Sequence, residues 1–370
     1  MNASILSLVI FVAVFAGVVF VHEFGHFVAS RLLKVEVEEF GFGLPPRLVR
    51  LFRWKGTDFT LNWLPIGGFV RPKGENDPSI EGGLAASSPW TRLAVLSAGP
   101  IMNLLLGVVV FSLLFFNMGV PDYHQVQIGD VLSGSPAAQA GIQVSDIVVS
   151  VNGVAIRDSG QLHDIIYANL DTPLEVTLRR GTETVTVTAT PSSTRPADQG
   201  ALGVSMGPAL VRPGSVIQSI RYGAIAVSAQ TRLLVLLPAQ LIRGQLSPEE
   251  SRLVGLKGIY DLFGQAVSRD IESRAAAPAA AGSASAETPT YFTLQLIGIL
   301  TISLGVLNLF PFPALDGGRI LFVLPELILR RRIPPQWENR INAAGMIALL
   351  ALMAYVNIMD FVNPAVVDLP

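Results

Sequence analysis

The chain has 370 residues, half of them apolar, with a mean hydropathy of +0.50 and a formal net charge of −2. This composition excludes an ordinary soluble protein and predicts a multi-span membrane protein with soluble parts. The net charge implies no nucleic-acid partner, and the absence of cysteine excludes disulfides, thiolate metal ligands and a cysteine nucleophile.

The first predicted span runs from about residue 5 to residue 33 and contains H-E-F-G-H at residues 22–26. On a helix, His22 and His26 lie one turn apart on one face, so both can bind one metal ion. Glu23 is then free to act as a general base, and zinc suits two imidazole ligands with an open position for water. The pattern also arises by chance in soluble helices, but burying ionisable groups in an apolar span is costly and favours a functional site.

The same apolar run resembles a signal peptide only in its position. No basic residue precedes it, and it carries the histidine motif inside it, which predicts a retained span and not a cleaved signal.

A polar, basic stretch separates the first span from a second one, predicted over residues 93–118. Within this stretch, residues 41–71 alternate apolar and polar side chains between glycines and prolines, which predicts a small β-region. Inside the second span, Asn103 either faces the site or makes a contact between helices, and the sequence leaves both interpretations open.

Residues 121–191 have the composition of a small soluble α+β domain. The series S-P-A-A-Q-A-G-I at 135–142 and S-D-I-V-V-S-V-N-G at 145–153 resembles a PDZ domain of the kind found in membrane and periplasmic proteases. Peptide-binding PDZ domains usually carry a Gly-Leu-Gly-Phe loop, and residues 118–127 contain none. A peptide-binding domain and a spacer without a ligand therefore both remain open.

Residues 192–289 are interpreted as a linker with interfacial helices. The stretch 192–213 is rich in proline, serine and glycine and predicts a linker with one short strand. The stretch 215–242 is apolar but interrupted by polar residues and proline, which favours a pair of amphipathic helices lying on the membrane. The alanine- and serine-rich tract at 275–286 predicts a mobile linker.

A third span, residues 291–309, runs into N-L-F-P-F-P-A-L-D-G-G at 308–318, and a fourth covers residues 342–361. Two prolines cannot continue a regular helix, and such a break is tolerated at membrane depth only inside protein or along a cavity. Asp316 standing alone would be a turn residue. Catalytic zinc needs a third protein ligand, however, and the matching depth of the H-E-x-x-H sequence favours Asp316 in that role.

Basic residues predict the orientation in the membrane. Nine of the Lys and Arg residues lie between the first two spans, five lie between the last two, and none precedes the first span. The positive-inside rule then places both loops in the cytoplasm. The N-terminus, the PDZ-like domain and the C-terminus are expected on the other side of the cell (inner) membrane. The histidine pair lies toward the cytoplasmic side.

H-E-F-G-H in a first span, N-x-x-P-x-P-x-L-D-G in a later one and a PDZ-like insertion between them resemble the site-2 protease family of intramembrane zinc metalloproteases. The resemblance covers nearly the whole chain and is to the bacterial regulator-of-sigma-E protease group. It implies that His22, His26 and Asp316 bind Zn²⁺ and that Glu23 is the catalytic base. It further implies that Asn308 holds the substrate backbone.

The resemblance implies an endopeptidase that cleaves within or near the transmembrane helices of single-span proteins, such as anti-sigma factors or signal-peptide remnants, in regulated intramembrane proteolysis. Gly41-Phe42-Gly43 and the strands after it resemble a membrane-dipping β-region beside the cleft. An exposed edge within Thr57–Val70 could accept an unwound substrate as an added strand, or the strands could only pack on lipid while Asn308 caps the broken helix.

The sequence departs from the family pattern in two places. It has one PDZ-like domain where many relatives have two. It also has G-L-K-G-I at 255–259 where many relatives show Gly-Pro-Val-Gly-Ile.

The predicted fold is a multi-span α-helical membrane protein with four transmembrane helices, a membrane-associated β-region and an inserted extracytoplasmic PDZ-like α+β domain. The alternative function is a catalytically silent PDZ-bearing membrane scaffold, against which the presence of Glu23 argues. A zinc carrier would need polar residues along several spans. The predicted divisions of the chain are 1–120 and 290–370 for the two halves of the membrane core, 121–191 for the PDZ-like domain and 192–289 for the linker with interfacial helices.

Overall fold

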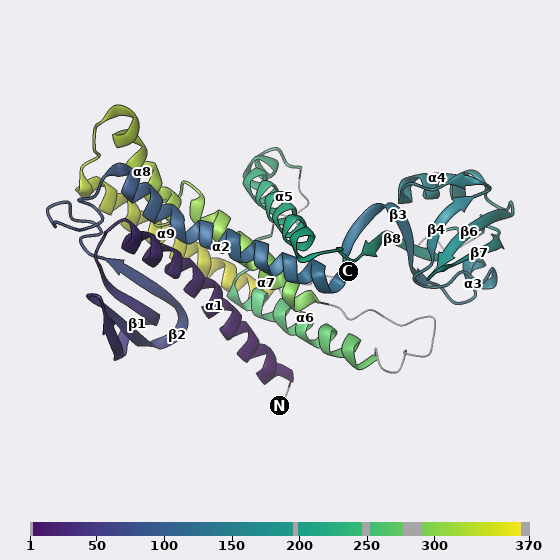
Figure 1. Ribbon diagram of the computed structural model, residues 1–370, viewed down its shortest axis with the longest axis horizontal. Helices are drawn as coiled ribbons and strands as arrows, with labels where there is room; N and C mark the ends of the chain where they lie inside the picture. Colours follow the sequence, from purple (N-terminus) through teal and green to yellow (C-terminus); the bar gives the residue numbers. More distant parts are fainter. Residues whose placement is uncertain (1–2, 195–198, 246–251, 277–290, 364–370) are drawn as a thin grey trace. The chain divides into compact units, whose positions relative to one another are not determined.

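The computed structural model describes residues 3–194, 199–245, 252–276 and 291–363. The chain forms two units (Figure 1), one with the long helices and a bent β-sheet, the other a smaller unit with its own sheet. The expected linker at 275–286 lies almost entirely outside the described residues. The first unit comprises residues 1–113, 220–269 and 291–370, and the second comprises residues 114–219 and 270–290.

Among the described residues, five helices are long and apolar enough to cross a membrane, judged by length and composition. Four of them cover the spans predicted from the sequence, and the fifth is α5. The five are α1 (Ala3–Leu32), α2 (Pro89–Met118), α5 (Val216–Ile242), α7 (Phe292–Leu309) and α9 (Pro335–Val362).

Helix α5 is a single helix of 27 residues, where the sequence predicts a pair of helices. Arg221 and Arg232 are exposed, so these side chains do not interrupt the backbone hydrogen bonds, and Pro238 lies near the C-terminal end. The first half packs on α2, since a Cβ atom added to Gly223 would lie 2.7 Å from the Val108 carbonyl oxygen. The polar residues therefore mark exposed positions along one helix.

Small residues bring α1, α2 and α7 together. A Cβ atom added to Gly25 of α1 would lie 2.5 Å from the Ala98 carbonyl oxygen of α2. One added to Gly305 of α7 would lie 3.0 Å from the carbonyl oxygen of Pro100, also in α2. Close approach through small residues is typical of membrane helices. Helix α2 thus contacts both α1 and α7, and side chains from all three helices can reach a common interior.

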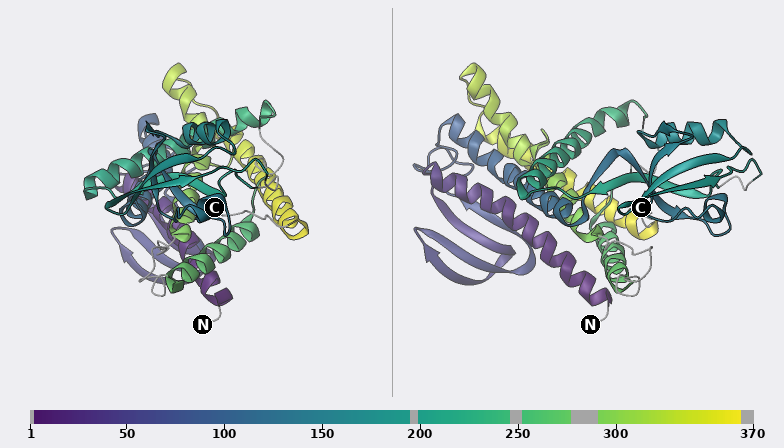
Figure 2. Two further views of the ribbon diagram at one scale, coloured as in Figure 1. Left: turned by 90° about the vertical axis from the view of Figure 1, so that its right-hand side faces the viewer. Right: turned by 45° about the vertical axis from the view of Figure 1, so that its right-hand side comes forward.

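The two strands of the first unit form a bent antiparallel sheet that lies along α1 (Figures 1 and 2). Because both strands bend, residues 39–42 pair with residues 58–61 on one side and with residues 68–71 on the other. The two edges of the sheet are therefore residues 47–54 and the edge segment 68–71. The strands are β1 (Val37–Trp54) and β2 (Thr57–Pro72).

Aromatic rings attach this sheet to α1. Phe40 lies with its ring centroid 5.6 Å from that of Phe20 and 5.4 Å from that of Phe27, both in an edge-to-face arrangement. Phe59 lies 5.7 Å from Phe27 in the same way. Such pairs stabilise beyond the area that they bury. The β-region is consequently fixed beside the helix that carries the histidine motif.

The proline break after α7 leads into a helix that the sequence analysis does not predict, α8 (Asp316–Leu329). Two glycines allow this helix to start directly beneath the break. A Cβ atom added to Gly317 would lie 2.2 Å from the Phe310 carbonyl oxygen, and one added to Gly318 would lie 2.2 Å from that of Phe312. The D-G-G sequence therefore packs Asp316 against the broken end of α7.

The G-L-K-G-I sequence at 255–259 begins α6 (Leu256–Ala276). The buried carboxylate of Asp360, in α9, accepts hydrogen bonds from the backbone N–H groups of Gly255 at 2.8 Å and of Gly258 at 3.0 Å. A Cβ atom on either glycine would lie 2.9 Å from this carboxylate. The two glycines thus let α9 cap the start of α6, which satisfies N–H groups that a helix start leaves open.

The second unit is built on a sheet with the order β7-β6-β4-β3-β8, and β5 pairs with β4. Its apolar core includes Val126, Leu162, Leu174 and Leu178. Strand β8 pairs along β3 although it lies beyond the predicted boundary at residue 191, in the segment interpreted as a linker. The elements are β3 (Val120–Val131), α3 (Pro136–Gln139), β4 (Ile147–Val151), β5 (Val154–Ala155), α4 (Ser159–Ala168), β6 (Leu174–Arg180), β7 (Glu183–Ala189) and β8 (Val204–Val211).

Candidate metal centre

Three side chains from two distant parts of the chain converge in the first unit. Nε2 of His22 lies 3.2 Å from Nε2 of His26, and these atoms lie 3.2 Å and 3.3 Å from one carboxylate oxygen of Asp316. The candidate ligand atoms all lie within 4.8 Å of one another. The structure therefore brings together the three residues that the sequence singles out as ligands.

A backbone carbonyl orients His26. Its Nδ1–H donates to the Val95 carbonyl oxygen of α2 at 2.8 Å, which leaves Nε2 without a proton and directed at the other two residues. The ring fits because Gly99 has no side chain, since a Cβ atom there would lie 2.3 Å from Nε2 of His26. Metal-binding histidines commonly donate a hydrogen bond from the N–H of the ring nitrogen that does not bind the metal.

Asn103 of α2 is fully buried and lies against His22, with its amide nitrogen 3.4 Å from Nδ1 of that ring. Its amide oxygen is buried and has no hydrogen-bond partner among the described residues. Turning the amide about its last torsion places the oxygen at Nδ1–H as an acceptor and leaves Nε2 of His22 as a ligand atom. Of the two interpretations of Asn103, the structure supports a place at the site.

Asp316 is held where α8 begins, below the break of α7. Its side chain is 17% exposed. One of its carboxylate oxygens faces Nε2 of both His22 and His26. Asp316 thus presents its carboxylate to both rings, and the ionised form is the one in which this side chain binds metals.

Glu23 lies beside this group and contacts the β-sheet. One of its carboxylate oxygens accepts a hydrogen bond from the Val70 backbone N–H at 3.0 Å. Val70 belongs to the edge segment 68–71, and a Cβ atom on Gly68 would lie 3.9 Å from the Glu23 side chain. An edge of the sheet thus runs past the carboxylate, within reach of the three converging side chains.

These groups line an open cavity of about 260 Å³. Asn308, from the last turn of α7, lines it together with Phe69, Val70 and Arg319. The cavity is small and open, and polar groups make up most of its exposed lining. Asn308 is therefore in the same cavity as the histidines, as the sequence analysis expects.

Two ion pairs fix α8 in the first unit. Arg319, one turn after Asp316, pairs with Glu75 and donates to the Asn76 side chain at 3.2 Å. Arg92 at the start of α2 pairs with Glu326 of α8. These bonds connect the helix that carries Asp316 to α2 and to the segment after β2.

Three groups at this site were not predicted from the sequence. Two are backbone groups, the carbonyl of Val95 and the N–H of Val70, and the third is Arg319. Backbone groups have no signature in a sequence, and an arginine after D-G-G is compatible with any exposed helix.

The donor set fits a zinc ion. Two neutral imidazole nitrogens and one carboxylate oxygen form a three-ligand set for catalytic zinc, and Glu23 stands next to the set without belonging to it. The Val95 carbonyl and the buried Asn103 amide are the outer partners that such histidines require.

Two histidines and an aspartate inside apolar helices, with a glutamate beside them, define the class of metallopeptidases that are embedded in membranes. A family model described as Peptidase family M50 matches residues 10–352, and the chain belongs to this family of zinc metalloproteases, the site-2 proteases.

Two relatives align with this chain along nearly their whole length. A candidate zinc metalloprotease of Mesorhizobium japonicum is 32% identical over 371 aligned residues, which cover 95% of this chain and 97% of the relative. The regulator of sigma-W protease RasP of Bacillus subtilis is 24% identical over 436 aligned residues, covering 96% of this chain and 98% of the relative.

Proposed function

We propose that this metalloendopeptidase hydrolyses peptide bonds within or near the transmembrane helices of single-span membrane proteins. The observation that carries the proposal is the convergence of His22, His26 and Asp316 beside Glu23, on helices apolar enough to cross a membrane. The name of the Bacillus subtilis relative, regulator of sigma-W protease, supports anti-sigma factors as substrates in regulated proteolysis. Signal-peptide remnants are the other candidate substrates.

The chemistry follows from the groups in the cavity. His22, His26 and Asp316 would hold a zinc ion, which would supply Lewis-acid chemistry for a carbonyl group and an attacking water. Glu23 accepts a proton from the attacking water and passes it to the leaving amine. The Val70 N–H holds one carboxylate oxygen of Glu23, and the other oxygen serves for proton transfer.

The substrate is presented along an edge of the sheet. Residues 58–61 are paired on both sides, so the part of Thr57–Val70 that can accept a strand is the edge segment 68–71. A helix hides its carbonyl groups in its own hydrogen bonds, and an unwound stretch can instead pair with this edge, main chain to main chain. Asn308 faces the same cavity and hydrogen-bonds the substrate backbone through its amide.

Four of the five apolar helices cross the membrane in this proposal, and α5 does not. Asp316 must lie at the depth of His22, so α7 crosses in the same direction as α1. If α5 crossed the membrane, the chain would have to cross back before α7. The helix between them, α6, is a poor membrane span because it carries six charged residues over its 21 positions. The N-terminus, the PDZ-like domain and the C-terminus then lie outside the inner membrane.

Impermeant thiol reagents applied to cells should label a Thr182→Cys variant and not a Glu81→Cys variant.

Metal content and cleavage, measured together, test the proposed roles. Glu23→Gln should retain zinc and lose activity by about 10²-fold to 10⁴-fold, the usual contribution of a general base. Asp316→Ala should lose both zinc and activity. The substrate is a reconstituted single-span protein, with and without a chelator.

Two results would contradict these assignments. Full zinc occupancy in Asp316→Ala would remove Asp316 from the ligand set. Normal cleavage by Glu23→Gln would remove the base, and a wild-type protein that binds zinc and partners but cleaves no membrane substrate would favour the PDZ-bearing scaffold.

A further inference from the structure

The side chains that the β1–β2 sheet exposes differ between its two ends, which lie beside different parts of α1. At one end, a Cβ atom added to Gly67 would lie 3.4 Å from the Val19 side chain. At the other end, Arg31 in the last turn of α1 donates to the Lys55 carbonyl oxygen at 3.1 Å. Twelve residues of helix between Val19 and Arg31 correspond to about 18 Å. The sheet therefore runs from the middle of the apolar helix to its basic end.

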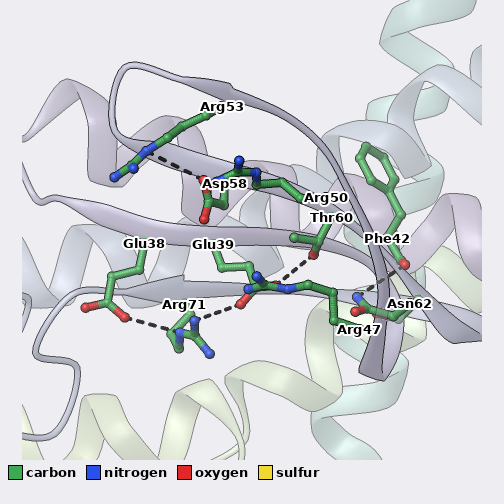
Figure 3. Close-up of polar contacts among 11 residues, drawn as sticks. Glu38, Glu39, Phe42, Arg47, Arg50, Arg53, Asp58, Thr60, Asn62 and Arg71 are labelled. Atoms are coloured by element: carbon green, nitrogen blue, oxygen red, sulfur yellow. Dashed lines mark hydrogen bonds and ion pairs between the residues drawn. The ribbon is translucent and has the colours of Figure 1, made fainter.

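The end near Val19 presents apolar side chains outward. Leu44, Leu48, Trp63 and Leu64 are between 42% and 64% exposed. Arg47 is also at this end, but its guanidinium group turns back to the buried Glu39, with contacts of 2.7 Å and 3.0 Å (Figure 3). This end of the sheet thus keeps its charge on an internal partner, as a surface facing hydrocarbon requires.

The end near Arg31 has unbalanced positive charge. Arg50 and Arg53, both more than half exposed, share one oxygen of Asp58 at 3.6 Å and 3.5 Å (Figure 3). One carboxylate neutralises at most one of the two guanidinium groups. Both contacts are too long for good hydrogen bonds and the guanidinium groups are exposed to water, so each ion pair is weak. Both side chains are therefore available to an anion.

Trp54 adds an interfacial element at the same end. Lys55 lies 5.0 Å from its ring centroid and Arg31 lies 5.8 Å from it. In the part of the chain that the structure describes, neither cation pairs with a carboxylate. Trp54 and the neighbouring Phe52 are about half exposed. Tryptophan beside basic residues is typical of the level at which lipid headgroups meet the acyl chains.

We propose that this end of the sheet binds the phosphate of an anionic phospholipid through Arg31, Arg50, Arg53 and Lys55. Guanidinium groups suit phosphate oxygens, and the exposed apolar rings beside them favour a lipid over a soluble anion. The bound lipid fixes the depth of the sheet in the leaflet where α1 ends. The inference rests on the membrane insertion of α1 and not on proteolytic activity.

Lipid binding to the purified full chain tests the proposal. The probes are phosphatidylglycerol and phosphatidylcholine, and bound lipid is counted by native mass spectrometry in detergent. The wild type should prefer phosphatidylglycerol. The double substitution Arg50→Gln with Arg53→Gln should weaken phosphatidylglycerol binding about 25-fold, from about fivefold per basic residue near an anionic surface.

Matched variants separate the site from general charge. Arg157→Gln with Arg212→Gln neutralises two exposed arginines of the second unit and should leave binding unchanged. The double substitution Arg50→Lys with Arg53→Lys should retain most of the phosphatidylglycerol binding. Zinc content is measured in every variant, and an unchanged value shows that the first unit is folded.

Three outcomes overturn the proposal. They are equal binding of the two lipids by the wild type, an unchanged phosphatidylglycerol affinity in Arg50→Gln with Arg53→Gln, and displacement of the lipid by millimolar inorganic phosphate. The last would identify a site for soluble anions. Because none of these readouts is proteolysis, an inactive protease would leave the result interpretable.

Discussion

Both units of the molecule bury apolar side chains, and they differ in the polar side chains that they bury with them. The unit built on β3–β8 buries an apolar core that includes Leu174 and Leu178 and keeps most of its polar groups outside. The helices α1 and α2 bury His22 and Asn103, while leucine, isoleucine and phenylalanine side chains along them are exposed. Burying ionisable and polar groups among apolar helices is costly, and a buried polar cluster of this kind favours a functional site.

The same contrast applies to two aspartates. Asp146, in the second unit, is 1% exposed, accepts two hydrogen bonds from Arg180 at 2.8 Å and 2.7 Å and a third from the Gln143 N–H. These bonds satisfy the carboxylate, and they raise the pKa of the Arg180 guanidinium. Asp316 instead faces two histidines that are themselves acceptors when neutral. One carboxylate is saturated by the protein, and the other needs a cation.

The largest expected effect comes from filling the contact between α1 and α2. Gly25→Ala places a methyl group 2.5 Å from the Ala98 carbonyl oxygen, so the two helices must separate. His26 then loses its hydrogen bond to the Val95 carbonyl oxygen. Overpacking of this kind costs about 1–3 kcal/mol of unfolding free energy. Zinc affinity and thermal stability should both fall.

Gly17→Ala is the matched control, since Gly17 lies on the same helix with nothing within 4 Å of an added Cβ atom. This variant should keep zinc and be neutral or slightly stabilised, because alanine favours a helix by about 1 kcal/mol over glycine. Equal zinc content in both variants would refute the close-packing account of the site.

Much of the candidate metal centre could be predicted because its residues form local motifs. His22 and His26 are related by helix geometry alone, and Asp316 follows a proline break that must line a cavity. The Val70 N–H and the Val95 carbonyl could not be predicted, since any residue supplies such a group and only the tertiary arrangement selects one. The sequence predicts one short strand in residues 192–213, where β8 lies, but not the place of this strand in the sheet. Its partner β3 lies more than 70 positions earlier, and pairing over that distance has no local signal.

The second prediction compares Asp146→Asn with Asp316→Asn. Asp146→Asn leaves Arg180 without its charged partner and should destabilise the second unit by about 2 kcal/mol, with zinc content unchanged. Asp316→Asn should lose zinc with little change in the stability of the metal-free protein. Hydrogen exchange of residues 120–211 and metal analysis distinguish the two. Loss of zinc in Asp146→Asn would mean that the two roles are not separate.

The smallest expected effect concerns the ion pair that fixes α8. Arg319 lies one turn from Asp316 and pairs with Glu75, and both side chains are less than one-third exposed. Arg319→Gln or Glu75→Gln should let α8 shift and lower kcat about twofold to fivefold while zinc is retained, because a partly exposed pair contributes about 1 kcal/mol or less and acts here through position.

The double variant shows whether the two residues act through each other. If they act only as a pair, Arg319→Gln with Glu75→Gln should be no slower than the slower single variant, whereas independent roles would multiply the two losses. Arg330→Gln, an exposed arginine after the last turn of the same helix, is the control and should keep the wild-type rate. Loss of zinc in Arg319→Gln would instead mean that this ion pair holds Asp316 within reach of the histidines, and its contribution would then belong to metal binding and not to the rate.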